Sequence, residues 1–173
     1  MGSFAQDVSR WADFYHLIGD ASAALMGLLF VSLSLNVKMV TGKGKADLRL
    51  LAVQTFISFL STLMFALIFM IPDQGPLGLG LPMLGIDLIV LTVTVIRILE
   101  MHAHQVRYRN NIGFVFRFAS PLLCFVTVLI IAGTVLTGRT GGLVWMVPVL
   151  IVLFWIASIN AWDLLLRLSK RPG

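Results

Sequence analysis

The segment at residues 50–72, LLAVQTFISFLSTLMFALIFMIP, decides the fold class because no Asp, Glu, Lys or Arg interrupts it. A membrane-spanning helix needs about 20 predominantly apolar residues, since the hydrocarbon core is roughly 30 Å thick. Three other windows are equally free of charge, at residues 21–37, 118–138 and 140–162. Each of these windows predicts a helix, because backbone groups cannot remain unpaired in lipid.

A fifth apolar stretch covers residues 81–101 and carries only Asp87, Arg97 and Glu100 as charged residues. None of the stretches alternates in the way that strands of a membrane β-barrel do. We therefore predict an all-α polytopic helical bundle that forms one domain over residues 1–173. An interfacial aromatic segment at about 3–15 should precede five spanning helices, at about 14–38, 48–71, 81–101, 116–136 and 143–167.

The composition agrees with a membrane setting and excludes a soluble enzyme. Hydrophobic residues make up 58% of the chain and charged residues only 12%, whereas soluble domains have about 45–50% and about 25%. The net charge of +5 is unevenly distributed. Near one set of predicted helix ends lie Lys38, Lys43, Lys45, Arg49, Arg97, Arg107, Arg109, Arg117, Arg167, Lys170 and Arg171, against Arg10 and Arg139 near the other.

This distribution predicts the orientation, because loops on the cytoplasmic side are enriched in Lys and Arg. The N-terminus should lie outside and the C-terminus in the cytoplasm. The basic face would contact anionic lipid headgroups. Nucleic acid is not an expected partner, since no predicted cytoplasmic segment is long enough to read bases.

Enzyme chemistry and cofactors are not expected. The chain has no nucleophile elbow, zinc-protease motif, phosphate-binding loop or dinucleotide fingerprint. Its single cysteine, Cys124, excludes disulfides within the chain. His102 and His104 are two residues apart and would point to different sides of a helix, which weakens a shared metal site. Whether a metal binds elsewhere stays open.

The first predicted helix carries the most informative pattern. At about 100° per residue, polar and small side chains fall on one line along it. Gly19, Ala23 and Gly27 form a ladder of small residues beside this line, which favours close helix packing. The line, called the helix-one stripe below, consists of Asp13, His16, Asp20, Ala24, Gly27, Val31, Ser34 and Lys38.

Two interpretations of the stripe are open. In the first, it is a packing seam whose terminal charges reach the headgroups. In the second, it lines an ion path, because charges within a bilayer are costly and usually functional. Asp87 in the third predicted helix should lie at a depth similar to that of Asp20. Two neighbouring carboxylates would bind a cation or share a proton, with His16 and Ser34 lining the way.

Two further charge pairs are expected to be structural. Arg97 and Glu100 are spaced i, i+3, and Asp163 and Arg167 are spaced i, i+4, near the predicted cytoplasmic ends of their helices. Pairs at these spacings face each other on one helix. We interpret them as ion pairs that fix the helix ends.

The segment from Asp20 to Asn36 contains the pattern Ala-x-Leu-x-Gly-Leu-Leu-Phe-Val-x-x-Ser-Leu at 23–35, and Pro72-Asp-Gln follows the second predicted helix. With these motifs the chain resembles a family of small, uncharacterised bacterial polytopic inner membrane proteins. The resemblance covers about the first half of the chain. It implies a bacterial inner membrane location and no particular activity.

Three functions remain in order of preference. The first is a homo-oligomer that forms a small ion-conducting path, with a monovalent or divalent cation as its ion. The second is a non-conducting accessory or regulatory subunit that packs on a larger membrane complex through Gly19, Ala23 and Gly27. The third is an intramembrane enzyme acting on lipid, which ranks last because no nucleophile–base pair can be named.

Overall fold

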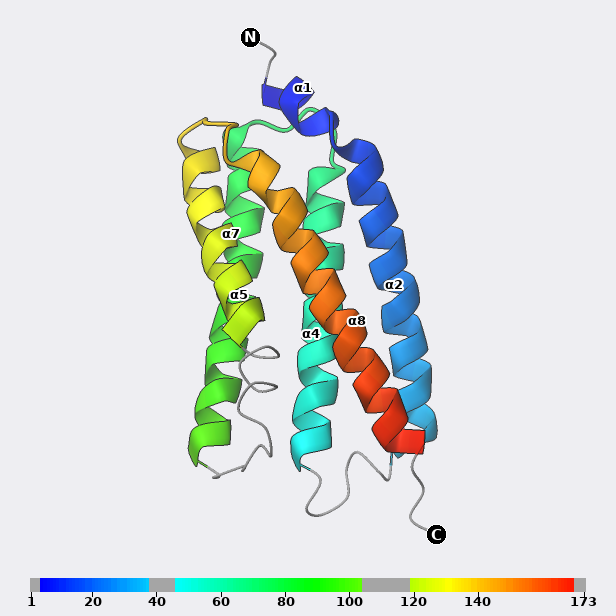
Figure 1. The fold of residues 1–173 in the computed structure, drawn as a ribbon. Helices are drawn as coiled ribbons and strands as arrows, with labels where there is room; N and C mark the ends of the chain where they lie inside the picture. Colours follow the sequence, from blue (N-terminus) through cyan, green and yellow to red (C-terminus); the bar gives the residue numbers. More distant parts are fainter. Residues whose placement is uncertain (1–3, 38–45, 104–118, 170–173) are drawn as a thin grey trace.

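The chain folds into a bundle of long helices (Figure 1). The computed structural model describes residues 4–37, 46–103 and 119–169, with the backbone alone at 46–47 and 100–103. All regular elements in these ranges are helical. In chain order they are α1 (Phe4–Ser9), α2 (Ala12–Leu35), α4 (Ala46–Phe69), α5 (Pro76–Ala103), α7 (Ser120–Leu136), the 3₁₀ turn η2 (Leu143–Trp145) and α8 (Met146–Ser169).

Four of these helices are long and apolar enough to cross a membrane: α2, α4, α5 and the continuous η2–α8 segment. The fifth predicted span, α7, has 17 residues in the described chain and is shorter than the other four. At about 1.5 Å per residue it is about 26 Å long. The all-helical class and four apolar, span-length helices are therefore established.

Helix α4 lies at the centre of the bundle. It packs against α2, α5 and α8, whereas α7 packs mainly on α5 and to a lesser extent on α8. In the apolar window of α4, 61% of the residues are buried, against 22% in that of α2. Helix α2 is therefore peripheral and has a wide face without a neighbour among the described residues.

The end of the bundle that carries α1 is called the upper end below, as drawn in Figure 1, and α8 ends at the opposite, lower end.

The predicted start of the third helix at residue 81 was late. The glycine-rich stretch before it predicted a loop, but α5 begins at Pro76. Proline suits the first turn of a helix because its fixed φ matches the helical value and its missing N–H needs no partner there. Gly80 is then used for packing, since a Cβ there would lie 2.7 Å from Leu136 Cδ2 of α7. Close approach of two helices, and not a turn, explains this glycine.

The region of the predicted N-terminal interfacial segment at 3–15 contains α1 and the first residues of α2. Helix α1 ends at Ser9, and α2 starts at Ala12 after a turn in which Trp11 N–H donates to Val8 O. Tyr15 belongs to α2 and is fully buried, with its ring stacked on Phe69 at 4.3 Å between centroids. This aromatic residue joins the core of the bundle, which the spacing of aromatic residues alone did not reveal.

Two apolar clusters fill the interior. The upper cluster draws on all the long helices and includes Tyr15, Phe65, Met83, Phe125 and Leu150. The lower cluster contains buried residues of α2, α4 and α8 only, among them Leu29, Leu51, Phe59 and Leu164. Among its described side chains, which end at Leu99, α5 therefore contributes no buried apolar side chain to the lower half.

Candidate functional site

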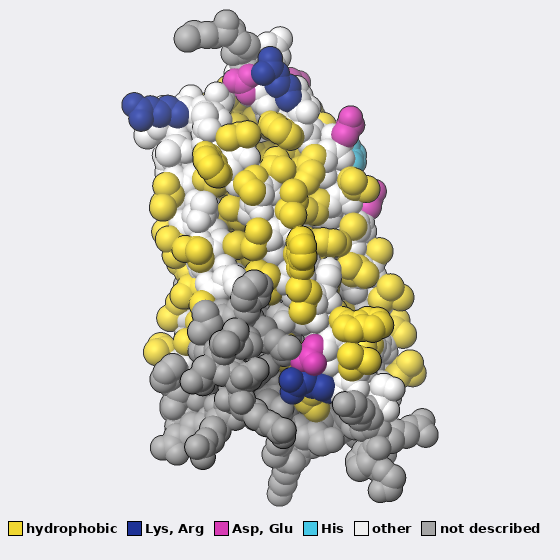
Figure 2. Space-filling view, viewed as in Figure 1, with side chains coloured by type: hydrophobic (Ala, Val, Ile, Leu, Met, Phe, Trp, Pro, Cys, Tyr) yellow, Lys and Arg dark blue, Asp and Glu magenta, His cyan; other side chains and the backbone are white. Residues whose placement is uncertain are grey.

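The helix-one stripe lies on the outer, unpartnered face of α2. Its seven described members, Asp13, His16, Asp20, Ala24, Gly27, Val31 and Ser34, are all exposed. Figure 2 shows acidic and histidine side chains along the edge formed by α2, next to a largely apolar surface. From Asp13 to Ser34 the stripe extends about 31 Å along the helix, close to the thickness of a hydrocarbon core. Lys38 lies outside the described residues.

The small-residue ladder is divided between two environments. Gly19 is buried against α4, where a Cβ would lie 3.2 Å from Ala66 Cβ. Ala23 and Gly27 are exposed, and an added Cβ at Gly27 would meet nothing within 4 Å. Gly19 therefore serves packing within the protomer. Ala23 and Gly27 leave a flat surface on which another helix could approach closely.

Asp87 lies inside the protein, on the face of α5 that also carries Met83 and Thr94. Its relative exposure is 0%, and neither carboxylate oxygen has a hydrogen-bond partner among the described residues. From Ile86 to Leu99 the only buried side chains of α5 are Asp87 and Thr94. A carboxylate in this setting is costly unless a proton or a bound cation neutralises it.

Asp20 and Asp87 are not brought together. Asp20 faces away from the bundle on α2, whereas Asp87 is enclosed, and α2 and α5 do not form one of the principal helix interfaces. They do lie at similar depths, about 12 Å and about 16 Å along their helices from the upper end. The similar depth predicted from the sequence is thus accompanied by different surroundings for the two carboxylates.

Several other buried side chains share the unpartnered state of Asp87. They come from all four span-length helices and lie in the middle and lower part of the bundle. We call Asp87 and these residues the interior polar cluster; the others are Ser22, Gln54, Ser58, Thr94 and Asn160. Gln54, Ser58, Thr94 and Asn160 stand out in the sequence as polar residues within long apolar stretches. Ser22 was missed, although its i+3 spacing from Gly19 could have placed it on the buried face of α2.

One predicted charge pair is present near the lower end of α8. Arg167 Nε lies 2.9 Å from Asp163 Oδ2, and both side chains are partly exposed. The side chain of Glu100 lies outside the described residues, so the Arg97–Glu100 pair is not described. His102 and His104 are likewise outside the side chains that the structure describes.

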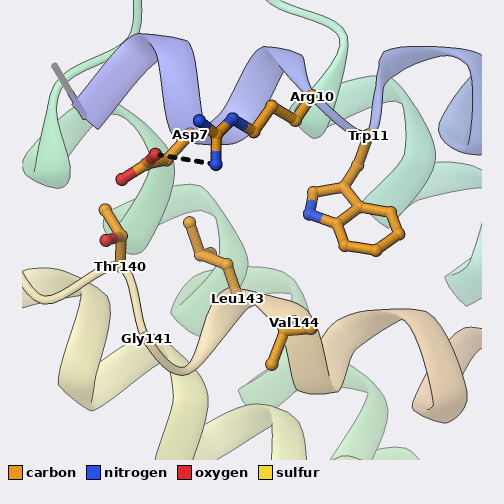
Figure 3. Close-up of a pocket in the computed structure, with 7 residues that line it drawn as sticks. All are labelled: Asp7, Arg10, Trp11, Thr140, Gly141, Leu143 and Val144. Carbon is orange, nitrogen blue, oxygen red and sulfur yellow. Dashed lines mark ion pairs between the residues drawn. The ribbon is translucent and has the colours of Figure 1, made fainter. Parts of the chain in front are cut away.

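A recess at the upper end lies between α1 and the turn before α8 (Figure 3). Its volume is about 370 Å³. Asp7 and Arg10 form its polar wall, with Arg10 Nη1 4.0 Å from Asp7 Oδ1. Trp11, Leu143 and Val144 supply the apolar wall. Arg10 is 76% exposed. This open recess of mixed polarity fits a position among headgroups more readily than an enclosed catalytic site.

Among the described side chains, no group of three or more His, Cys, Asp or Glu could hold a metal ion. Comparisons with protein-family models, with curated proteins and with solved structures each returned no match to this chain. The fold and the polar residues therefore define a class: a small all-helical protein with four apolar helices long enough to span a membrane, an exposed polar stripe and a buried polar interior.

Proposed function

We propose that the protein is a homo-oligomer in a bacterial inner membrane and that the exposed stripe of α2 lines an ion path between protomers. The observation that carries this proposal is the exposure of Asp20, Ala24, Gly27 and Ser34 on one face of α2. In a lone protomer this face would meet lipid, where an acidic side chain is costly. A closed ring of copies would instead turn the stripe toward a shared axis.

Five passes, with the N-terminus outside and the C-terminus in the cytoplasm, complete this arrangement. Helix α7 is apolar and runs beside α5, so it can cross most of the hydrocarbon core as the fifth pass. The ends of the bundle that carry α1 and the C-terminus are opposite each other (Figure 1), as an odd number of passes requires. The basic residues near the lower end of the bundle would then contact anionic headgroups of the cytoplasmic leaflet.

The chemistry of the stripe favours cations. Asp13 and Asp20 place two carboxylates in its upper third, and His16 lies between them one turn from each. Carboxylates repeated around a symmetric ring raise the local concentration of cations and exclude anions. Below them, Ala24 and Gly27 would allow the helices to approach closely, and Ser34 would supply a hydroxyl near the lower end. Ser34 Oγ already donates to Phe30 O, so it offers its lone pairs to the path.

A second candidate is a non-conducting accessory or regulatory subunit. The exposure of Ala23 and Gly27 favours it equally, because a helix of a different protein could pack on the same flat surface. The two candidates differ in what covers the stripe: another copy of α2, or a partner chain.

Cysteine cross-linking separates these candidates. The only native cysteine, Cys124, is buried, and a Cys124→Ala background leaves the chain free of thiols. Single cysteines introduced at Ala24 or Gly27 should cross-link copies of the purified protein in native-like membranes. Ile130→Cys is the matched control, because Ile130 is 64% exposed on α7, away from α2. Cross-linking at Ile130 but not at the stripe would contradict the proposed assembly.

Flux measurements test the path itself. Proteoliposomes containing the wild-type protein should pass sodium, potassium or protons, and Asp20→Asn should lower this flux at least several-fold without dissociating the oligomer. Chloride serves as the control ion. An oligomer cross-linked through the stripe that passes no ion would overturn conduction and favour a structural role for the same surface.

A further inference from the structure

The interior polar cluster occupies a band around the central helix of the bundle. At about 1.5 Å per residue, Ser22, Ser58 and Asp87 lie about 15–17 Å from the upper ends of their helices. Gln54 and Asn160 lie about 21–23 Å from them, and Thr94 about 27 Å. Helix α4, which carries Gln54 and Ser58, packs against each of the helices that carry the other members: α2, α5 and α8.

Most other buried hydroxyls on α4 are hydrogen-bonded, so burial on this helix does not by itself leave a hydroxyl without a partner. Thr55, Ser61 and Thr62 each donate to the carbonyl oxygen four residues earlier, at 2.6–2.9 Å. Ser58, although buried between them, has no partner in the described chain, and neither do the amide groups of Gln54 and Asn160. Buried polar groups are nearly always hydrogen-bonded, so a set of orphans in one band requires an explanation such as a bound ion or water.

The donor set of the band matches a single positive charge. It offers one carboxylate, three hydroxyls and two amide oxygens, which are the ligands that hard cations prefer. The single negative charge of the Asp87 carboxylate is balanced by one proton or one alkali cation. We propose that each protomer binds one unit of positive charge, as a proton or an alkali cation, inside the bundle at Asp87, with Ser58 of the adjacent helix α4, at a similar depth, as its nearest neutral oxygen ligand.

The neighbouring elements contain no described cation that could replace this ligand. Among titratable and charged residues, α7 carries only Cys124, and α4 carries Asp47 and Arg49 near its lower end. Arg49 lies nine residues from Ser58, about 13 Å along the helix. On α5 itself, Arg97 is ten residues from Asp87, about 15 Å away along the helix. The charge of Asp87 therefore needs a partner that the described side chains do not supply.

This site is separate from the ion path proposed above. The path lies between copies and uses the outer face of α2, whereas the interior site is enclosed by one chain. The interior site can exist in a monomer, and its occupancy is measurable without flux. Failure of either proposal leaves the other intact.

Thermal unfolding of the purified full-length chain in detergent tests the interior site. A ligand that binds only the folded state raises Tm with concentration. In the alkali arm, sodium or potassium replaces N-methylglucamine at constant ionic strength, and saturation should raise Tm by about 5 °C. In the proton arm, pH is varied with N-methylglucamine as the only added cation. Dependence on alkali cation assigns the site to that ion, and dependence on pH alone assigns it to a proton.

Two sets of variants decide whether the response belongs to this site. Asp87→Asn should abolish the dependence, while Asp20→Asn should retain it. Ser58→Ala should move the midpoint of the response by about tenfold, whereas Ser61→Ala should leave it unchanged, because the Ser61 hydroxyl is already bonded within α4. Should Asp87→Asn fail to fold, the two serine variants still decide. A response that persists in Asp87→Asn, equal responses in the serine variants, or no response in either arm would overturn the proposal.

Discussion

Gly19 of α2 lies directly against Ala66 of α4: a Cβ added at Gly19 would be 3.2 Å from Ala66 Cβ. Eight residues further along α2, Gly27 faces open space. Two glycines of one sequence ladder thus have opposite roles: one holds the protomer together, and the other leaves its outer surface flat.

The first prediction uses this contrast. Gly19→Leu should destabilise the protomer by about 1–3 kcal/mol or more, because the side chain would have to displace α4. Gly27→Leu should leave protomer stability unchanged or slightly higher, since leucine has the better helix propensity, but it should block cross-linking through the stripe. Unfolding in detergent measures the first effect and cross-linking the second. Equal destabilisation by both substitutions would contradict the assignment of the two faces.

The second prediction concerns Tyr15, whose ring stacks on Phe69 and whose hydroxyl is buried without a partner in the described chain. Tyr15→Ala should cost about 3–5 kcal/mol because it leaves a cavity between α2 and α4. Tyr15→Phe keeps the ring and removes an unsatisfied polar group, so it should be neutral or stabilising. Comparing the two Tm values checks both. A large loss of stability in Tyr15→Phe would mean that the hydroxyl has a partner, such as a water molecule.

The sequence predicts the long helices well because their signal is local. A charge-free window must be helical in lipid whatever its neighbours are, so the observed bounds of α4, Ala46–Phe69, differ little from the predicted 48–71. The start of α5 at Pro76 was missed because glycines such as Gly80 are typical of loops as well as of close helix contacts. The use of Gly80 for packing depends on Leu136, which is distant in the sequence, so the local pattern does not reveal it.

The candidate site could be predicted only in part, for a similar reason. Helical periodicity places Asp20 and Ser34 on one line, but periodicity does not say whether that line faces the protein or its surroundings. Depth can be counted along a helix, so the sequence alone supports assigning Asp20 and Asp87 to similar levels. Which helix is adjacent to which depends on tertiary packing, and the central position of α4 separates the surroundings of these two residues.

The third prediction tests the turn that ends α7. Gly138 has a positive φ of 79°, and its N–H donates to Val135 O at 2.8 Å while Arg139 N–H donates to Thr134 O. Gly138→Ala should cost about 1 kcal/mol, since a side chain disfavours this backbone conformation. Gly141→Ala is the control, because a Cβ there has no neighbour within 4 Å and its φ is not positive. Thermal unfolding should separate the two variants, and indistinguishable Tm values would argue against the left-handed turn.

The last prediction concerns whether Asp20 and Asp87 act as one site or as two. If Asp20 and Asp87 shared a cation or a proton, removing one would change the consequence of removing the other. Because Asp20 is exposed on α2 and Asp87 is enclosed on α5, we expect no such coupling. In a double-mutant cycle of Asp20→Asn and Asp87→Asn, the changes in unfolding free energy should add to within about 0.5 kcal/mol. Chemical unfolding of the wild type, both single variants and the double variant supplies the four values. A coupling energy of about 1 kcal/mol or more would place the two carboxylates in a common site. The interior site at Asp87 and the proposed path along α2 would then be one site and not two.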